Sequence, residues 1–169
     1  HIYPGLIALN TSLGLNEIEA VRATGDTRET GTVNPSARTI IAYNTDSKIT
    51  PTVRSNGVLT AQIVPEGGRI SGTSSIVNLD AWNWEDAAYK TDAGMHFRVP
   101  NLSGARGGRA AFLAQLGLGG GQSDPVKAAL ERIDNVRKFF MEAKAYYAQE
   151  KPEHVNLKFE ALYSTTVFK

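Results

Sequence analysis

Few residues of this chain have the types and the spacing of a self-contained catalytic or metal site. Cysteine is absent, which excludes disulfides, thiolate nucleophiles and cysteine-ligated zinc or iron–sulfur centres within the chain. The three histidines, His1, His96 and His154, lie far apart, and none has a second histidine two or four positions away. We therefore expect no metal site built from a short histidine motif, and the default interpretation of His96 is a packed, hydrogen-bonded strand residue.

Two further groups of residues have a type that could do chemistry, but their context favours structural roles. The glycine cluster 117–122 precedes a helical pattern, as phosphate-binding loops do. However, the G-x-G-x-x-G pattern fails at Gln122 and no G-K-[ST] motif is present, so a flexible surface loop is favoured. Asp80, Glu85 and Asp86 flank two tryptophans, and we interpret these carboxylates as helix-start and surface charges rather than an acid–base pair.

Charge and hydropathy exclude two classes of partner. Lys and Arg number 18 and Asp and Glu number 17, which gives a net charge of +1. This balance argues against a nucleic-acid partner, because no basic surplus is available to neutralise phosphates. No apolar run approaches the roughly 20 residues that span a bilayer, so no membrane partner is expected. The absence of cysteine fits both reducing and oxidising compartments and leaves localisation undecided.

The elements that must position any site follow from turn residues and hydrophobic periodicity. Strand patterns occur at 6–9, 58–64, 75–79 and 94–99. Helical patterns occur at 16–22, 34–42, 84–90, 125–147 and 157–162, and at 47–55 with a break at Pro51. A glycine-rich loop fills 101–122. Alternating strands and helices predict an α/β fold with two or three parallel strands, but a closed barrel needs about 250 residues.

The first strand carries a resemblance to a known family. The turn Pro4-Gly5-Leu6-Ile7 and the strand after it resemble the start of the barrel of metal-dependent amidohydrolases, especially the imidazolonepropionase-related branch. In that family the strand ends with Asp-x-His-x-His, and the two histidines bind the catalytic metal. In the same register, this chain has Ala8 at the Asp position and Asn10 and Ser12 at the two histidine positions.

Three later stretches are similar to the same branch in the same order. They are "GLNEIEAVRATGDTRETGTVNPSARTIIAYNTDS", "VRSNGVLTAQIVPEGGRISGTSSIVNLD" and, before the family's third strand, "FEALYSTTVFK". The resemblance implies that residues 1–169 form a single α/β segment, a partial TIM-barrel-like structure made of the first strands and helices. It also implies that the chain is the N-terminal portion, or fragment, of a longer parent protein.

The resemblance implies a function for the parent more than for this chain. The parent would hydrolyse carbon–nitrogen bonds of cyclic amides with a metal-activated water, and zinc is the expected divalent ion. An amide and a hydroxyl are poor substitutes for imidazoles, so we expect no metal and no catalytic residue in this chain. Asn10 and Ser12 would instead line the mouth of the site and contact a small-molecule substrate.

Two alternatives to an active hydrolase remain at this point. The chain could belong to a non-catalytic pseudoenzyme that acts as a binding or scaffolding protein, which the residues Asn10 and Ser12 favour. A partial barrel would also expose apolar strand edges, so it could form a homo-oligomer or associate with the rest of the parent chain.

Overall fold

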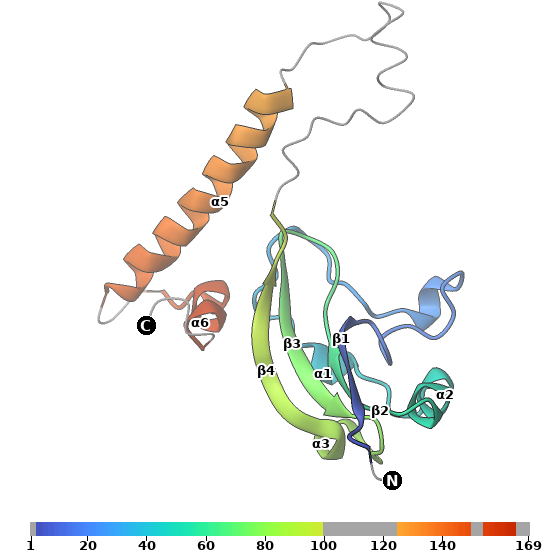
Figure 1. The fold of residues 1–169 in the computed structure, drawn as a ribbon. Helices are drawn as coiled ribbons and strands as arrows, with labels where there is room; N and C mark the ends of the chain where they lie inside the picture. The colour runs from blue at the N-terminus through green and yellow to red at the C-terminus, as the bar shows by residue number, and fades with distance from the viewer. Residues whose placement is uncertain (1–2, 100–124, 150–153, 165–169) are drawn as a thin grey trace, which may run out of the picture. The chain divides into compact units, whose positions relative to one another are not determined.

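The computed structural model describes residues 3–99, 125–149 and 154–164. The chain divides into two compact units, one formed by His1–Arg98 with His154–Lys169 and the other by Val99–Glu153. The first unit contains a four-stranded sheet, and the second contains a long helix (Figure 1). No described helix is both long enough and apolar enough to cross a membrane.

The sheet is mixed. It consists of β1 (Leu6–Thr11), β2 (Val58–Ile63), β3 (Ile70–Asn78) and β4 (Ala88–Phe97) in the order β1-β2-β3-β4 (Figure 1). Strands β1 and β2 are parallel, whereas β2, β3 and β4 are successively antiparallel. The α/β class is therefore confirmed, and of the two or three parallel strands expected the sheet contains two that pair in parallel, β1 and β2.

The lengths of the connections explain this difference. A parallel pair needs a crossover of about a dozen residues or more, and residues 12–57 provide one between β1 and β2. The connection from β2 to β3 spans only residues 64–69, which suffices for an antiparallel return. Gly67 and Gly68 make this tight turn possible, because their φ angles of 82° and 57° are strained for other residues.

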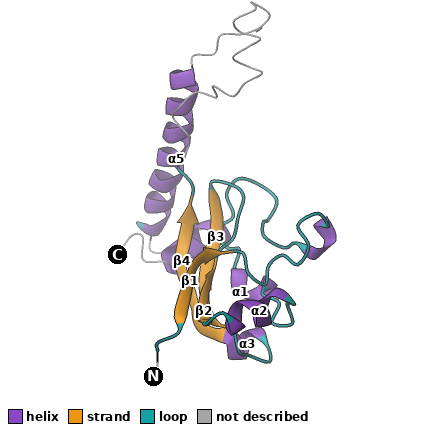
Figure 2. Ribbon diagram, turned by 45° about the vertical axis from the view of Figure 1, so that its right-hand side comes forward, coloured by secondary structure: helices purple, strands orange, loops and turns teal. Residues whose placement is uncertain are grey.

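The short helices lie in the connections. They are the 3₁₀ helix η1 (Arg22–Thr24), α1 (Thr39–Ala42), α2 (Ile49–Ser55) and α3 (Trp84–Ala87). Figure 2 shows α1, α2 and α3 grouped toward the end of the sheet where β3 finishes. The expected helical turns at 16–22 are replaced by η1, and the helix expected from 34 onward begins only at Thr39.

Pro51 does not break α2, contrary to the sequence interpretation. It is the third residue of the helix, within the first turn, where a backbone N–H has no intrahelical partner and its loss costs little. Asn83 starts α3, because its side-chain oxygen accepts a hydrogen bond of 2.7 Å from the backbone N–H of Asp86.

Two C-terminal helices agree with their sequence patterns. The long helix α5 covers Pro125–Tyr147, as its hydrophobic periodicity predicts. The short helix α6 covers Leu157–Ser164 and belongs to the unit that contains the sheet. The glycine-rich loop expected at 101–122 lies outside the described residues.

The hydrophobic core lies between the sheet and the helices of the connections. Its buried members are Ile40, Tyr43, Ala61, Ile63, Val77, Leu79 and Ala87. Ala61 and Ile63 alternate along β2, and Val77 pairs opposite Ala61 from β3, so one face of the sheet supplies most of the core. Ile40 of α1 is fully buried against this face.

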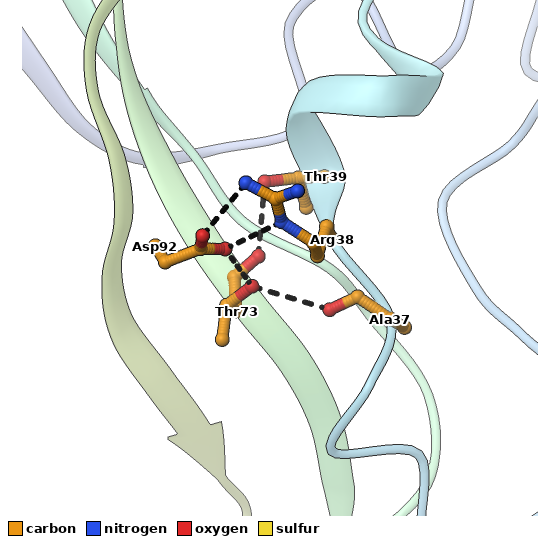
Figure 3. A network of polar contacts seen from close by, with 5 residues as sticks. All are labelled: Ala37, Arg38, Thr39, Thr73 and Asp92. Atoms are coloured by element: carbon orange, nitrogen blue, oxygen red, sulfur yellow. Dashed lines mark hydrogen bonds and ion pairs between the residues drawn. The ribbon is translucent and has the colours of Figure 1, made fainter. Parts of the chain in front are cut away.

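A polar network attaches the segment before α1 to β3 and β4 (Figure 3). Arg38 donates two hydrogen bonds to Asp92, from Nε to Oδ1 at 3.0 Å and from Nη2 to Oδ2 at 2.8 Å. Thr73 Oγ1 donates to the same carboxylate at 2.7 Å. Partial burial tends to raise the pKa of Asp92, but these hydrogen bonds and the charge of Arg38 outweigh it and hold the pKa below its ordinary value.

Gly72 allows the same segment to approach the sheet closely. Its φ is 124°, and an added Cβ would lie 2.8 Å from Ala37 Cβ and would collide with the Ala37 carbonyl oxygen. That oxygen accepts a hydrogen bond of 2.8 Å from the backbone N–H of Thr73. Only glycine therefore combines this backbone conformation with this contact.

Gly72→Ala should destabilise the chain by about 2 kcal/mol or more, because it adds backbone strain to a steric overlap with Ala37. Gly94→Ala is the matched control on β4. Its added Cβ would meet only Ser74 Oγ at 3.9 Å, so its effect should stay within about 0.5 kcal/mol. Urea unfolding followed by circular dichroism measures both changes. Similar losses in the two variants would contradict the assigned role of Gly72.

Asp92→Asn should cost about 1 kcal/mol at neutral pH, because it removes the charge from the hydrogen bonds of Arg38 and Thr73. A carboxyl with a lowered folded-state pKa stabilises above its ordinary pKa, and this contribution is lost as the pH falls through the lowered value. The stability difference between wild type and variant should therefore disappear in acid. Asp80→Asn, which weakens an exposed ion pair with Arg54, is the control and should change stability less. A difference that persists at low pH would refute the electrostatic explanation.

Candidate functional site

The carboxyl ends of β1, β2 and β4 lie at the same end of the sheet. Strands β1 and β2 are parallel, and β4 runs in the same direction because both β2 and β4 are antiparallel to β3. A pocket of about 290 Å³ lies at this end. Its lining consists of Asn10, Thr11, Ser12, Val64, Pro65, Glu66, Ser71, His96, Phe97 and Arg98. We refer to it as the strand-end pocket.

Asn10 and Ser12, the two substrate-contact residues expected from the sequence, both line the strand-end pocket. Asn10 has a φ of 55°, and the pairing of β1 with β2 is irregular between Ala8 and Thr11. Bulges of this kind redirect side chains and occur often beside functional sites, and asparagine tolerates a positive φ better than most residues. Substrate contact by Asn10 and Ser12 stays a prediction.

The pocket does not supply a donor set that fits a catalytic zinc ion. From the first strand, Asn10 offers an amide and Ser12 a hydroxyl, while Ala8 packs against the core. His96 is the lining imidazole and Glu66 the lining carboxylate. Across residues 3–99, 125–149 and 154–164, no three His, Asp or Glu side chains lie close enough together to hold a metal ion. The expectation of no metal in this chain stays a prediction.

His96 contributes an imidazole to the pocket lining. It is half-buried on β4 and lines the pocket, and its imidazole makes no hydrogen bond with any described residue. The expected strand position of His96 is confirmed, and its expected hydrogen bond stays a prediction. Partial burial lowers the pKa of His96 below its ordinary value, which favours the neutral imidazole at neutral pH.

Two charged residues complete the lining. Glu66 follows β2 and Arg98 follows β4, and both residues are exposed. Neither makes an ion pair within the described residues. Backbone hydrogen bonds hold their positions, from Glu66 N to Thr27 O at 2.7 Å and from Arg98 N to Arg69 O at 2.8 Å. Sequence reasoning singled out neither Glu66 nor Arg98 and gave His96 only a structural role, although all three lie at strand ends, where sites of parallel sheets form.

The other sequence candidates lie elsewhere. Asp80 follows the end of β3, at the opposite edge of the sheet, and pairs with Arg54. Asp86 lies in α3, where its carboxylate accepts a hydrogen bond of 3.2 Å from the backbone N–H of Trp82. These contacts confirm helix-start and surface roles for the two carboxylates. His154 is exposed, and the glycine cluster 117–122 lies outside the described residues.

Comparison with known proteins gives one informative similarity. No protein-family model matches the chain, and no curated protein matches it. Its structure resembles the crystal structure of an amidohydrolase from Thermotoga maritima MSB8, with a TM-score of 0.63 and 18% sequence identity. The match covers 94% of this chain and 41% of that chain, so this chain spans about two fifths of the length of the solved protein. The similarity shows that the mixed α/β fold corresponds to part of an amidohydrolase structure.

Proposed function

We propose that this chain is the N-terminal portion of an amidohydrolase-related protein whose parent hydrolyses carbon–nitrogen bonds of cyclic amides. The observation that carries the proposal is the structural match to an amidohydrolase over 94% of the chain. The motif Pro4-Gly5-Leu6-Ile7 at the start of β1 supports it independently. So does the position of the strand-end pocket at the carboxyl end of β1, where barrel enzymes build their sites.

The proposal extends to the imidazolonepropionase-related branch and to a partial barrel. Strands β1 and β2 are parallel and are joined through α1 and α2, which is the connectivity from which barrels are built. The antiparallel strands β3 and β4 would then be an addition to the alternating strands and helices of a barrel. The sequence similarity to this branch runs through the same elements, in the same order.

In this proposal the chain does not catalyse hydrolysis by itself. A zinc ion in the parent would supply an activated water. The amide of Asn10 and the hydroxyl of Ser12 are poor ligands for such an ion, so any metal would have to be held by residues outside this chain. Asn10 and Ser12 would instead hydrogen-bond a small-molecule substrate in the strand-end pocket.

One observation favours a second candidate function. The residues at both first-strand ligand positions, Asn10 and Ser12, can donate and accept hydrogen bonds but bind metals weakly. A parent that lost its metal in this way would be a pseudoenzyme that binds a small molecule or acts as a scaffold. The pocket would persist in that case, because its shape depends on the strand ends and not on a metal.

We also propose that β1 is a contact surface, either with the rest of the parent chain or with a second copy of this chain. Leu6, Ile7 and Leu9 are 62%, 63% and 71% exposed. Strand β1 is at the edge of the sheet and pairs only with β2 among the described strands. Strands of parallel sheets are normally covered on both faces, so an apolar strand exposed in this way favours association.

The parent protein should contain stoichiometric zinc and hydrolyse a simple cyclic amide such as hydantoin, whereas the 169-residue chain should do neither. Asn10→Ala in the parent should leave the zinc content unchanged and raise KM about fivefold, because one substrate hydrogen bond of roughly 1 kcal/mol is lost. Asn78→Ala, an exposed asparagine at the opposite edge of the sheet, is the matched control. Elemental analysis and steady-state kinetics provide the measurements.

If the parent protein contains no zinc and hydrolyses no cyclic amide, the proposed hydrolase function is overturned and the pseudoenzyme proposal is supported. Loss of zinc in Asn10→Ala would show that Asn10 is a metal ligand after all, against the role assigned to it here.

The isolated 169-residue chain should form oligomers through β1, and Leu9→Lys should shift it toward the monomer because it places a charge on the apolar edge strand. Leu130→Lys on α5 is the control, since Leu130 is 54% exposed and lies outside the sheet. Light scattering measures the mass of each variant. A monomeric wild-type chain at high concentration would count against β1 as a self-association surface.

A further inference from the structure

We propose that the strand-end pocket binds a small molecule that carries a carboxylate next to an amide N–H, and that His96 and Arg98 are its principal contacts. The inference rests on the proposed function for the use of this pocket, but it requires no metal. It assigns a binding role to the end of β4, which the resemblance to amidohydrolases does not address.

The first observation is the imidazole of His96, which is half-buried in the lining of the pocket and makes no hydrogen bond with another described residue. A ligand that displaces water from a half-buried imidazole has to replace the hydrogen bonds that the water made, so a matching ligand needs both a donor and an acceptor. A neutral imidazole has one N–H donor and one nitrogen acceptor. It can therefore donate to an oxygen of the ligand and accept from an N–H, which a carboxylate and an adjacent amide supply together.

The second observation is the pair of opposite charges in the lining. Glu66 and Arg98 come from the ends of different strands and do not pair with each other in the structure. Arginine matches the planar geometry of a carboxylate, and the carboxylate of Glu66 accepts hydrogen bonds from an N–H. A ligand with both groups satisfies both residues, whereas a multiply charged phosphate would be repelled by Glu66.

The remaining lining fits a compact polar molecule. From β1 and the residue after it, Asn10 and Ser12 provide an amide and a hydroxyl, and Phe97 provides an apolar surface. The volume of about 290 Å³ is just below the usual range of small-molecule pockets, roughly 300–1,000 Å³. This size favours a small metabolite and excludes a folded macromolecule.

N-acetylglycine is a suitable probe, because it combines a carboxylate with a secondary amide N–H. The 169-residue chain contains only three histidines, so the imidazole proton resonances can be assigned by substitution. Titration with N-acetylglycine should shift the His96 resonance in a saturable manner. N-acetylglycinamide, which lacks the negative charge, should bind at least about tenfold more weakly, since it cannot form the charge-assisted hydrogen bonds with Arg98.

Matched variants test the two residues separately. His96→Gln and Arg98→Gln should each weaken binding about tenfold or more, and Arg98→Lys should retain part of the affinity. His154→Gln and Arg54→Gln make the same substitutions at residues outside the pocket and should bind like wild type. Because the His96 resonance is absent from His96→Gln, its binding is followed by calorimetry. Circular dichroism verifies that each variant folds, and Arg98 is exposed, so its substitutions test the proposal even if His96→Gln is unstable.

Absence of saturable binding, equal affinity for the neutral amide, or full affinity in Arg98→Gln would overturn the inference. These results are independent of the zinc and hydrolysis measurements on the parent protein. Binding without hydrolysis in the parent would refute the hydrolase but leave the pocket assignment intact. Hydrolysis in the parent without N-acetylglycine binding by this chain would refute only the pocket assignment.

Discussion

The contact between the Ala37–Thr39 segment and strand β3 is the constraint on which much of the fold depends. The carbonyl oxygen of Ala37 accepts a hydrogen bond from the backbone N–H of Thr73, in space that exists only because residue 72 is glycine. Asp92 then holds Arg38 from the neighbouring strand β4 (Figure 3). This attachment fixes the long crossover from β1 to β2 against the sheet and places Ile40 of α1 in the core.

The antiparallel return of the chain through β3 and β4 determines the composition of the candidate site. A regular succession of parallel strands would place a helix after β2, whereas here the short turn after β2 sends the chain back along it. Strand β4 then ends at the same edge as β1, so His96 and Arg98 join Asn10 and Ser12 around one pocket. The site combines residues from β1 and β4, the first and last strands of the sheet.

Sequence patterns predicted local structure well where one periodicity dominated. The strand expected at 58–64 corresponds to β2, and the long amphipathic pattern corresponds to α5. The strand expected at 75–79 is longer in the structure, because β3 already begins at Ile70. Gly72 and its polar neighbours lie outside the strand pattern of the sequence, yet they belong to β3, against which Ala37 packs and hydrogen-bonds. A contact across so many residues leaves no local signal in the sequence.

The sequence by itself determined the α/β class, the apolar first strand, and the presence of Asn10 and Ser12 at the end of that strand. These features depend on residue type and short-range periodicity, which the chain carries wherever it folds. Only the tertiary structure decided the direction of β3 and β4. It alone also placed His96 in the lining of the same pocket as Glu66 and Arg98. Strand pairing and burial arise from contacts between distant segments, and their energies depend on the neighbours that folding brings together.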